Sequence, residues 1–374
     1  MTRPLEALTH QGVAVWVDSI ARDWLHKGEL RRLRDDYQVV GVTSNPTIFQ
    51  KAMGEGSFYD DDIARLAREG RHASEIFEAL ALDDVRAAAD DMEPVYQRTQ
   101  GLDGRISFEL PPGIAGDTEA SIRGARRLFD ALARPNVFIK IPATAAGVPA
   151  IRASLAAGIN INVTLIFSIE RYREVMDAFM TGLEDLAASG GDLTEIASVA
   201  SFFVSRVDTN VDRKLQALVD KDGAGAERAR SRLGTAAVDN AKLAWEAFQE
   251  QTATERWRAL AAAGARPQRP LWASTSTKNP AYRDVLYVEE LVARGSVNTM
   301  PTETLDAFQD HGEVRGQTIL EGADRAHRLW SDLAELGIEE AQVMRELEAE
   351  GVDRFADSYR GAVSTIEAKR ARAG

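Results

Sequence analysis

The sequence contains no cysteine among its 374 residues. Disulfide bonds, thiolate nucleophiles, Fe–S clusters and cysteine-ligated zinc are therefore excluded. No apolar run approaches the roughly 18 residues of a membrane-spanning helix, and the first residues lack the apolar core of a secretory signal. We therefore expect a cytoplasmic protein that has no membrane as a partner.

Histidine is also scarce, and its spacing does not suit metal binding. The sequence has neither an HxH nor an HExxH pattern, and it lacks a P-loop, a GxGxxG turn and a GxSxG elbow. The five histidines are His10, His26, His72, His311 and His327. We expect them on surface helices and loops, and we expect neither a metal ion nor a bound cofactor.

Basic residues are outnumbered. The 45 lysines and arginines face 58 acidic residues, which gives a net charge of −13. With no basic stripe, nucleic acid is not an expected partner, although a local cluster of cations can still bind a phosphorylated metabolite. Hydrophobic content of 44% and charged content of 28% are typical of a soluble globular protein.

Eight short strand-like segments alternate with amphipathic helical patterns, for example at 117–133 and 168–188. The predicted strands are 13–18, 38–43, 105–109, 137–141, 159–165, 196–201, 270–274 and 296–299. This alternation predicts an α/β fold, a (β/α)8 TIM barrel that forms a single domain over residues 1–374. Such a barrel needs about 250 residues. We therefore assign the surplus to helical insertions near 57–99 and 226–263 and to a C-terminal helical extension.

One lysine, Lys140, interrupts an apolar and β-branched run, VFIKIPAT from Val137 to Thr144. The run is typical of a parallel strand buried on both faces, where a charged ammonium is costly. Burial favours the free amine, which is the nucleophile for carbonyl carbons, so Lys140 is a candidate Schiff-base residue. The alternative is a lysine at a strand end with its ammonium in solvent.

Polar residues gather where the predicted strands end, which is where a barrel carries its chemistry. They are Asp18, Thr43 with Ser44 and Asn45, Glu109, Lys140, Asn162 with Thr164, Ser201, and Ser274. Asn45 before Pro46 also fits a helix N-cap, and each carboxyl could instead cap a helix or pair with an arginine. Asn162 and Thr164 share one strand face, which is either the barrel interior or the helix-facing layer.

This set of side chains suits carbonyl chemistry through an imine. A lysine forms the iminium, one carboxylate moves a hydroxyl proton during C–C cleavage, and another group handles the water that is lost and regained.

Six motifs in order, together with a C-terminal one, resemble the transaldolase family. They are GVTSNPTIF (41–49), VFIKIPAT (137–144), INVTLIFS (161–168), SFFVSR (201–206), WASTSTKNP (272–280), NTMPTETL (298–305) and EGVDRFADSYRGAVSTIE (350–367). The resemblance extends from about residue 13 to 305, and the last motif looks like the family's final helix.

The resemblance implies a role for each candidate residue. Lys140 matches the Schiff-base lysine, Asp18 matches the acid that exchanges a proton with the C4 hydroxyl, and Glu109 with Thr164 matches the pair that holds a catalytic water. Asn45, Asn162 and Ser201 match positions that bind the hydroxyls of a dihydroxyacetone unit. Arg206, Ser274 and Lys278 fall where the family binds a sugar phosphate. Many members carry arginine at the Lys278 position, and lysine offers a point charge in place of a two-pronged fork.

Fructose-6-phosphate aldolases resemble transaldolases but have glutamine and tyrosine where this chain has Glu109 and Phe203. The resemblance therefore implies transfer: sedoheptulose 7-phosphate and glyceraldehyde 3-phosphate give erythrose 4-phosphate and fructose 6-phosphate, in the non-oxidative pentose phosphate pathway. A pyridoxal-phosphate enzyme and a silent sugar-phosphate-binding barrel remain as alternatives. A homodimer and a monomer are both compatible with the sequence. For Phe355 and Tyr359, one turn apart near the C-terminus, we favour ordinary core packing over contact with the barrel mouth or another subunit.

Overall fold

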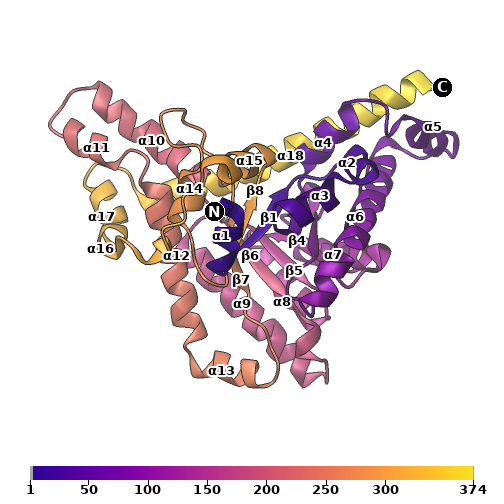
Figure 1. Ribbon diagram of the computed structural model, residues 1–374, viewed down its shortest axis with the longest axis horizontal. Helices are drawn as coiled ribbons and strands as arrows, with labels where there is room; N and C mark the ends of the chain where they lie inside the picture. The colour runs from indigo at the N-terminus through magenta and orange to yellow at the C-terminus, as the bar shows by residue number, and fades with distance from the viewer. Residues whose placement is uncertain (1–2, 374) are drawn as a thin grey trace.

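Eight parallel strands close into a barrel at the centre of the structure, a computed structural model that describes residues 3–373 (Figure 1). The strands pair in chain order, and β8 returns to β1. They are β1 Ala14–Asp18, β2 Val39–Thr43, β3 Arg105–Glu109, β4 Val137–Pro142, β5 Ile161–Ile166, β6 Ser198–Phe203, β7 Arg269–Ala273 and β8 Val297–Met300. The predicted (β/α)8 fold is confirmed, and each predicted strand overlaps an observed one.

Four strands end later than the sequence predicts: β4, β5 and β8 by one residue each and β6 by two. β6 continues to Phe203 because its pairing with β7 extends through Phe202 with Trp272 and Phe203 with Ala273. β5 begins at Ile161, because the preceding Asn160 lies outside the strand and its side chain accepts a hydrogen bond from the Ala197 amide. β5 then runs on to Ile166 across an irregular register with β6.

Helices surround the barrel and fill its insertions. In chain order they are α1 Pro4–His10, α2 Arg22–Lys27, α3 Glu29–Asp36, α4 Pro46–Gly54, α5 Asp60–Arg68, α6 Ala73–Arg98, α7 Thr118–Leu132, α8 Gly147–Ala156, α9 Ile169–Ala188, α10 Ser205–Asp220, α11 Ala226–Arg232, α12 Ala236–Thr252, α13 Glu255–Ala262, α14 Leu286–Glu290, α15 Thr302–His311, α16 Ala323–His327, α17 Leu329–Ala334 and α18 Glu340–Ala373, with short 3₁₀ turns at Pro112–Ile114, Leu193–Glu195 and Thr318–Leu320. Helices α5 and α6 occupy the predicted insertion at 57–99, and α11, α12 and α13 occupy the one at 226–263.

The last helix, α18, is the longest. It packs against α4, α5 and α6, and it also touches α10 and β5. In Figure 1 it is the yellow helix that passes along the side of the molecule where α4 and α5 lie. No helix within residues 3–373 is both long and apolar enough to cross a membrane. All five histidines are exposed, as the sequence predicts.

Large side chains fill the barrel interior. The rings of Trp16 on β1 and Phe138 on β4 stack with centroids 6.1 Å apart, which is possible only inside the barrel because these strands are not neighbours. Gly41 on β2 makes room for Trp16, since a Cβ there would lie 2.3 Å from the indole ring. The Arg105 guanidinium lies over Phe138, 5.0 Å from the ring centroid, and is itself buried. This filling leaves the carboxyl ends of the strands as the place for a cavity.

Candidate active site

Lys140 lies in the middle of β4, and every residue of that strand is buried. The lysine is 5% exposed. Its Nζ donates a hydrogen bond to the Ser44 carbonyl oxygen at 2.9 Å and lies 3.7 Å from Glu109 Oε2. The predicted alternative, an ammonium in solvent, is therefore wrong. The close polar partners of the buried amine are the Ser44 carbonyl oxygen and the Glu109 carboxyl, which are held by β2 and β3 of the barrel.

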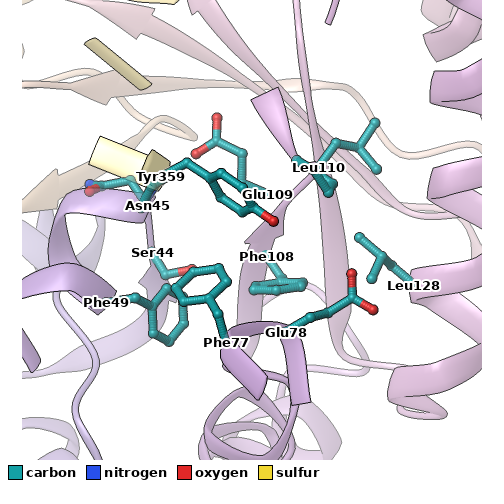
Figure 2. A pocket seen from close by; sticks show the side chains of 12 residues that line it. Ser44, Asn45, Phe49, Phe77, Glu78, Phe108, Glu109, Leu110, Leu128 and Tyr359 are labelled. Carbon is teal, nitrogen blue, oxygen red and sulfur yellow. The ribbon is translucent and has the colours of Figure 1, made fainter. Parts of the chain in front are cut away.

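Glu109 ends β3, beside Lys140 in the strand register. Its side chain is 7% exposed, and Oε2 has no hydrogen-bond partner within residues 3–373. Burial raises the pKa of Glu109 to about 7, against the opposing effect of the Lys140 charge. Figure 2 shows a neighbouring pocket, in which Glu109 lies next to Tyr359 and its carboxyl points away from the rings of Phe49, Phe77 and Phe108. A carboxyl with this pKa exchanges protons readily at neutral pH.

Asp18 ends β1 and lines a cavity that Lys140 also lines. Its Oδ1 accepts a hydrogen bond from Thr43 Oγ1 at 2.6 Å, and Thr43 Oγ1 lies 2.7 Å from Thr299 Oγ1. Burial raises the pKa of Asp18, while the Lys140 charge and the Thr43 hydroxyl lower it. Within residues 3–373 no arginine hydrogen-bonds Asp18; Thr43, which itself contacts Thr299, orients the carboxyl instead.

A short hydrogen-bond chain lies beneath the cavity. Ser201 Oγ donates to Asn162 Oδ1 at 2.7 Å, and Asn162 Nδ2 donates to Ser107 Oγ at 3.0 Å. Asn162 therefore faces the barrel interior, which settles which strand face is polar. Ser201 reaches the cavity, whereas Asn162 is fully buried and does not line it.

Thr164 is presented by a distorted part of β5. Leu165, the next residue, has φ 59°, a left-handed conformation that is strained for leucine. The strand register shifts at the same place, between Val163 and Ile166. Thr164 Oγ1 is buried, lines the cavity and has no hydrogen-bond partner in the described chain. A hydroxyl in this state can bind a water or a substrate oxygen.

Asn45 combines both predicted roles. Its Oδ1 accepts a hydrogen bond from the Ile48 amide at 3.1 Å, which makes it the N-cap of α4. The same residue lines the cavity. Because the cap uses only the carbonyl oxygen, the amide nitrogen remains as a hydrogen-bond donor for a ligand.

Two cations and several hydroxyls form the outer end of the cavity. Arg206, in the first turn of α10, has its guanidinium 5.0 Å from the Phe203 ring centroid, and its buried NH1 has no partner within residues 3–373. Burial lowers the pKa of Arg206 to about 10. Lys278 Nζ donates to Ser276 Oγ at 2.6 Å, and partial loss of hydration together with the Arg206 charge lowers the pKa of Lys278, although its side chain reaches the surface. Ser274 lies between them in the lining and has a left-handed φ of 57°. Two cations with unsatisfied donors are suited to an anion such as a phosphate.

One cavity of about 130 Å³ collects these residues. Of the predicted site residues, Asp18, Asn45, Lys140, Thr164, Ser201, Phe203, Arg206, Ser274 and Lys278 line it, and Glu109 and Asn162 stand directly behind the lining. The structure adds Thr43, Ser276, Thr299 and Phe355. All four stand in motifs that the sequence had already marked, but for Phe355 the sequence favoured core packing over contact with the barrel mouth. In the chain from residue 3 to 373, no three histidine or acidic side chains converge as a metal site.

Comparison with known proteins gives a consistent result. A family model described as transaldolase/fructose-6-phosphate aldolase matches residues 15–366. A Parafrankia sp. (strain EAN1pec) protein named transaldolase is 50% identical over 366 residues, covering 98% of this chain and 98% of the relative. A Mycolicibacterium paratuberculosis protein named transaldolase is 51% identical over 356 residues, covering 95% and 94%. Transaldolase 2 of Streptomyces coelicolor is 48% identical over 372 residues, covering 100% and 98%.

Proposed function

Because this chain belongs to the transaldolase/fructose-6-phosphate aldolase family, we propose that it moves a dihydroxyacetone unit from sedoheptulose 7-phosphate to glyceraldehyde 3-phosphate, giving erythrose 4-phosphate and fructose 6-phosphate. Transaldolase activity as such is supported by the family and by the names of the relatives. The choice of sugars, the lysine imine and a place in the non-oxidative pentose phosphate pathway are the further content of the proposal.

The observation that carries the proposal is the buried amine of Lys140 between a carboxyl and a polar cavity. In the proposed reaction, Nζ adds to the C2 carbonyl of the donor sugar, and the carbinolamine loses water to form an iminium. Glu109, at 3.7 Å from Nζ and with a pKa of about 7, takes a proton from the amine and returns one to the departing hydroxyl. The free hydroxyl of Thr164 holds the water that leaves and later returns.

Asp18 performs the proton transfer that accompanies C–C cleavage. It accepts the proton of the C4 hydroxyl while the C3–C4 bond breaks and the electron pair passes to the iminium, leaving an enamine on Lys140. Thr43 holds the Asp18 carboxyl through its 2.6 Å hydrogen bond, so the carboxyl is oriented before the substrate arrives. The reverse sequence, with the aldehyde of the acceptor, forms the new C–C bond.

The remaining residues bind the sugar. Asn45 and Ser201 are available for hydroxyls of the three-carbon unit, and Asn162 orients Ser201 from below. Arg206 and Lys278, with Ser274 and its neighbouring hydroxyls, bind the phosphate at the outer end. Both the donor and the acceptor carry a phosphate, so a single anion site serves both halves of the reaction.

A borohydride trap tests the imine. The protein is mixed with fructose 6-phosphate and no acceptor, reduced, and analysed by intact mass and peptide mapping. We expect a three-carbon adduct on the Lys140 peptide and none in Lys140→Ala. Absence of an adduct in folded protein that binds the sugar would favour a binding-only barrel, and a visible chromophore in the purified protein would favour pyridoxal-phosphate chemistry.

Transfer is distinguished from simple cleavage by the acceptor. We expect fructose 6-phosphate to be consumed much faster with erythrose 4-phosphate as the acceptor, giving sedoheptulose 7-phosphate and glyceraldehyde 3-phosphate, than with no acceptor at all. Free dihydroxyacetone released equally fast without an acceptor would identify an aldolase instead.

A further inference from the structure

Helix α18 lies directly on the mouth of the barrel. Gly351 marks the closest approach, because a Cβ there would lie 3.0 Å from Leu165 Cδ2 and 3.5 Å from Arg206 NH1. The helix backbone therefore rests on the distorted end of β5 and on the base of the anion site. One turn further along, the same face of the helix carries Phe355.

Phe355 is 8% exposed, and its ring covers the amine of Lys140. The ring centroid lies 5.9 Å from Lys140 Nζ and 5.9 Å from Arg206 Cζ. Phe203, the other ring of the cavity, instead contacts Arg206 at 5.0 Å and Phe167 at 5.4 Å. Core packing, which the sequence favours for Phe355, is confirmed because the residue belongs to the buried hydrophobic core, and its ring also lines the cavity.

Phe355 also lines a second, almost wholly apolar cavity of about 10 Å³. Its lining includes Leu110, Pro142, Leu165 and Val352, with Glu109 at its edge. Phe355 thus stands between two spaces, one polar and open to substrate and one apolar. Its removal would join them beside the amine of Lys140.

Transfer requires an intermediate that survives until the acceptor arrives. After C3–C4 cleavage, protonation of the enamine at C3 gives the iminium of dihydroxyacetone on Lys140. Addition of one water to C2 gives a carbinolamine, whose C–N bond then breaks to yield free dihydroxyacetone and the lysine ammonium; the water oxygen becomes the carbonyl oxygen and both of its protons end on the nitrogen. Exclusion of water from the space beside C2 slows this loss without hindering the acceptor aldehyde, which bonds at C3.

We infer that Phe355 is the wall that keeps additional water away from the lysine imine, so that helix α18 determines how the intermediate divides between transfer and hydrolysis. This inference rests on the proposed transaldolase function. Phe355 acts by occupying space and moves no proton, so a smaller side chain should change the ratio of hydrolysis to transfer more than it changes either rate through proton transfer.

The test measures two rates with fructose 6-phosphate as donor: dihydroxyacetone release without an acceptor, and sedoheptulose 7-phosphate formation with erythrose 4-phosphate as acceptor. The ratio of release to transfer is compared for the native protein and for Phe355→Leu, Phe355→Val and Phe355→Ala. We expect the ratio to rise as the side chain shrinks, by about tenfold in Phe355→Ala and less than about threefold in Phe355→Leu. Ile366→Ala is the matched control, because Ile366 is buried on the same helix about three turns further on and does not line the cavity.

Each outcome decides the inference. A graded rise, with the ratio unchanged in Ile366→Ala, supports it. An unchanged ratio of release to transfer in folded Phe355→Ala overturns the inference. A ratio in Phe355→Leu that rises as far as in Phe355→Ala also overturns it, because the aromatic ring, and not the volume of an apolar side chain, would then protect the iminium. If Phe355→Ala does not fold, Phe355→Val decides in the same way. Failure of the proposed function is seen separately, as absence of the borohydride adduct in the native protein.

Discussion

Replacement of Glu109 by glutamine should make the folding stability less dependent on pH. The pKa of this carboxyl is raised by burial from 4.5 to about 7. The folded protein therefore holds the Glu109 proton more tightly than the unfolded chain does. Below pH 4.5 both states are protonated, and the stabilisation from the raised pKa is fully present. As the pH rises towards 7 the unfolded chain ionises first, and this contribution is lost.

The difference between 4.5 and about 7, at about 1.4 kcal/mol per pKa unit, corresponds to about 3 kcal/mol of unfolding free energy. Glu109→Gln removes this titration but keeps a neutral side chain of the same size. The unfolding free energies of the variant and the native protein should therefore differ by a constant amount at low pH. As the pH rises, the variant should gain stability relative to the native protein, by about 3 kcal/mol once the pH exceeds 7. Asp208, whose pKa burial also raises to about 7, is present in both proteins and cancels in the comparison.

Urea unfolding followed by tryptophan fluorescence, at pH values from about 4.5 to 8.5, measures this difference. Trp16 and Trp272 are fully buried and report the loss of the barrel. A difference between the two proteins that does not change with pH would refute the reasoning. A native protein that gains stability over the variant as the pH rises would show that attraction to Lys140 outweighs burial, and that the Glu109 pKa is lowered.

Three further substitutions test the supporting contacts. Thr43→Val removes the hydroxyl that lowers the Asp18 pKa. The acid limb of the pH profile of kcat/KM should therefore move to higher pH, and kcat should fall by about tenfold. A pH profile that does not shift would contradict this role of Thr43. Lys278→Ala should raise KM for fructose 6-phosphate by about tenfold with kcat changed less than about twofold, and a fall in kcat alone would place Lys278 outside the phosphate site. Tyr282→Phe deletes a 2.8 Å hydrogen bond to Asp212, which ties the loop of Lys278 to α10. The KM for the phosphorylated donor should therefore rise by about threefold, while the KM for dihydroxyacetone as donor should not change. An equal effect on both KM values would mean that the loop does not position the phosphate.

Local sequence patterns were sufficient to locate the barrel strands and the lysine. A strand buried on both faces has to be apolar and β-branched, so Lys140 stands out against Val137, Phe138 and Ile139 without any knowledge of its neighbours. The carboxyl ends of parallel strands then meet at one rim, and this brings Asp18 and Glu109 to Lys140. Prediction succeeded here because strand period and barrel closure are imposed by the backbone.

Other features depend on contacts between segments far apart in the sequence. Nothing near Phe355 indicates that its ring faces Lys140, because that contact follows from how α18 rests on Leu165 at Gly351. The left-handed conformation of Leu165 is equally hidden, since leucine has no local preference for it and the surrounding packing must hold it. The hydroxyls that surround Lys278 could not be predicted either, because Ser274 and Ser276 lie in a loop whose side chains do not alternate with a regular period.

Under the proposed function, the depth of each residue in the barrel explains how one cavity would protect an imine and still exchange phosphorylated sugars. Lys140 lies within a strand, so its position is fixed by the ladder on both sides and by the ring of Phe355 above it. Lys278 lies in the loop after β7 and is exposed, where a phosphate can arrive with much of its hydration. Arg206 connects the two levels, because it contacts Phe355 and also faces the anion site. Water can therefore fill the outer end, where charge must be solvated, while the inner end, where water would hydrolyse the intermediate, is closed by apolar side chains.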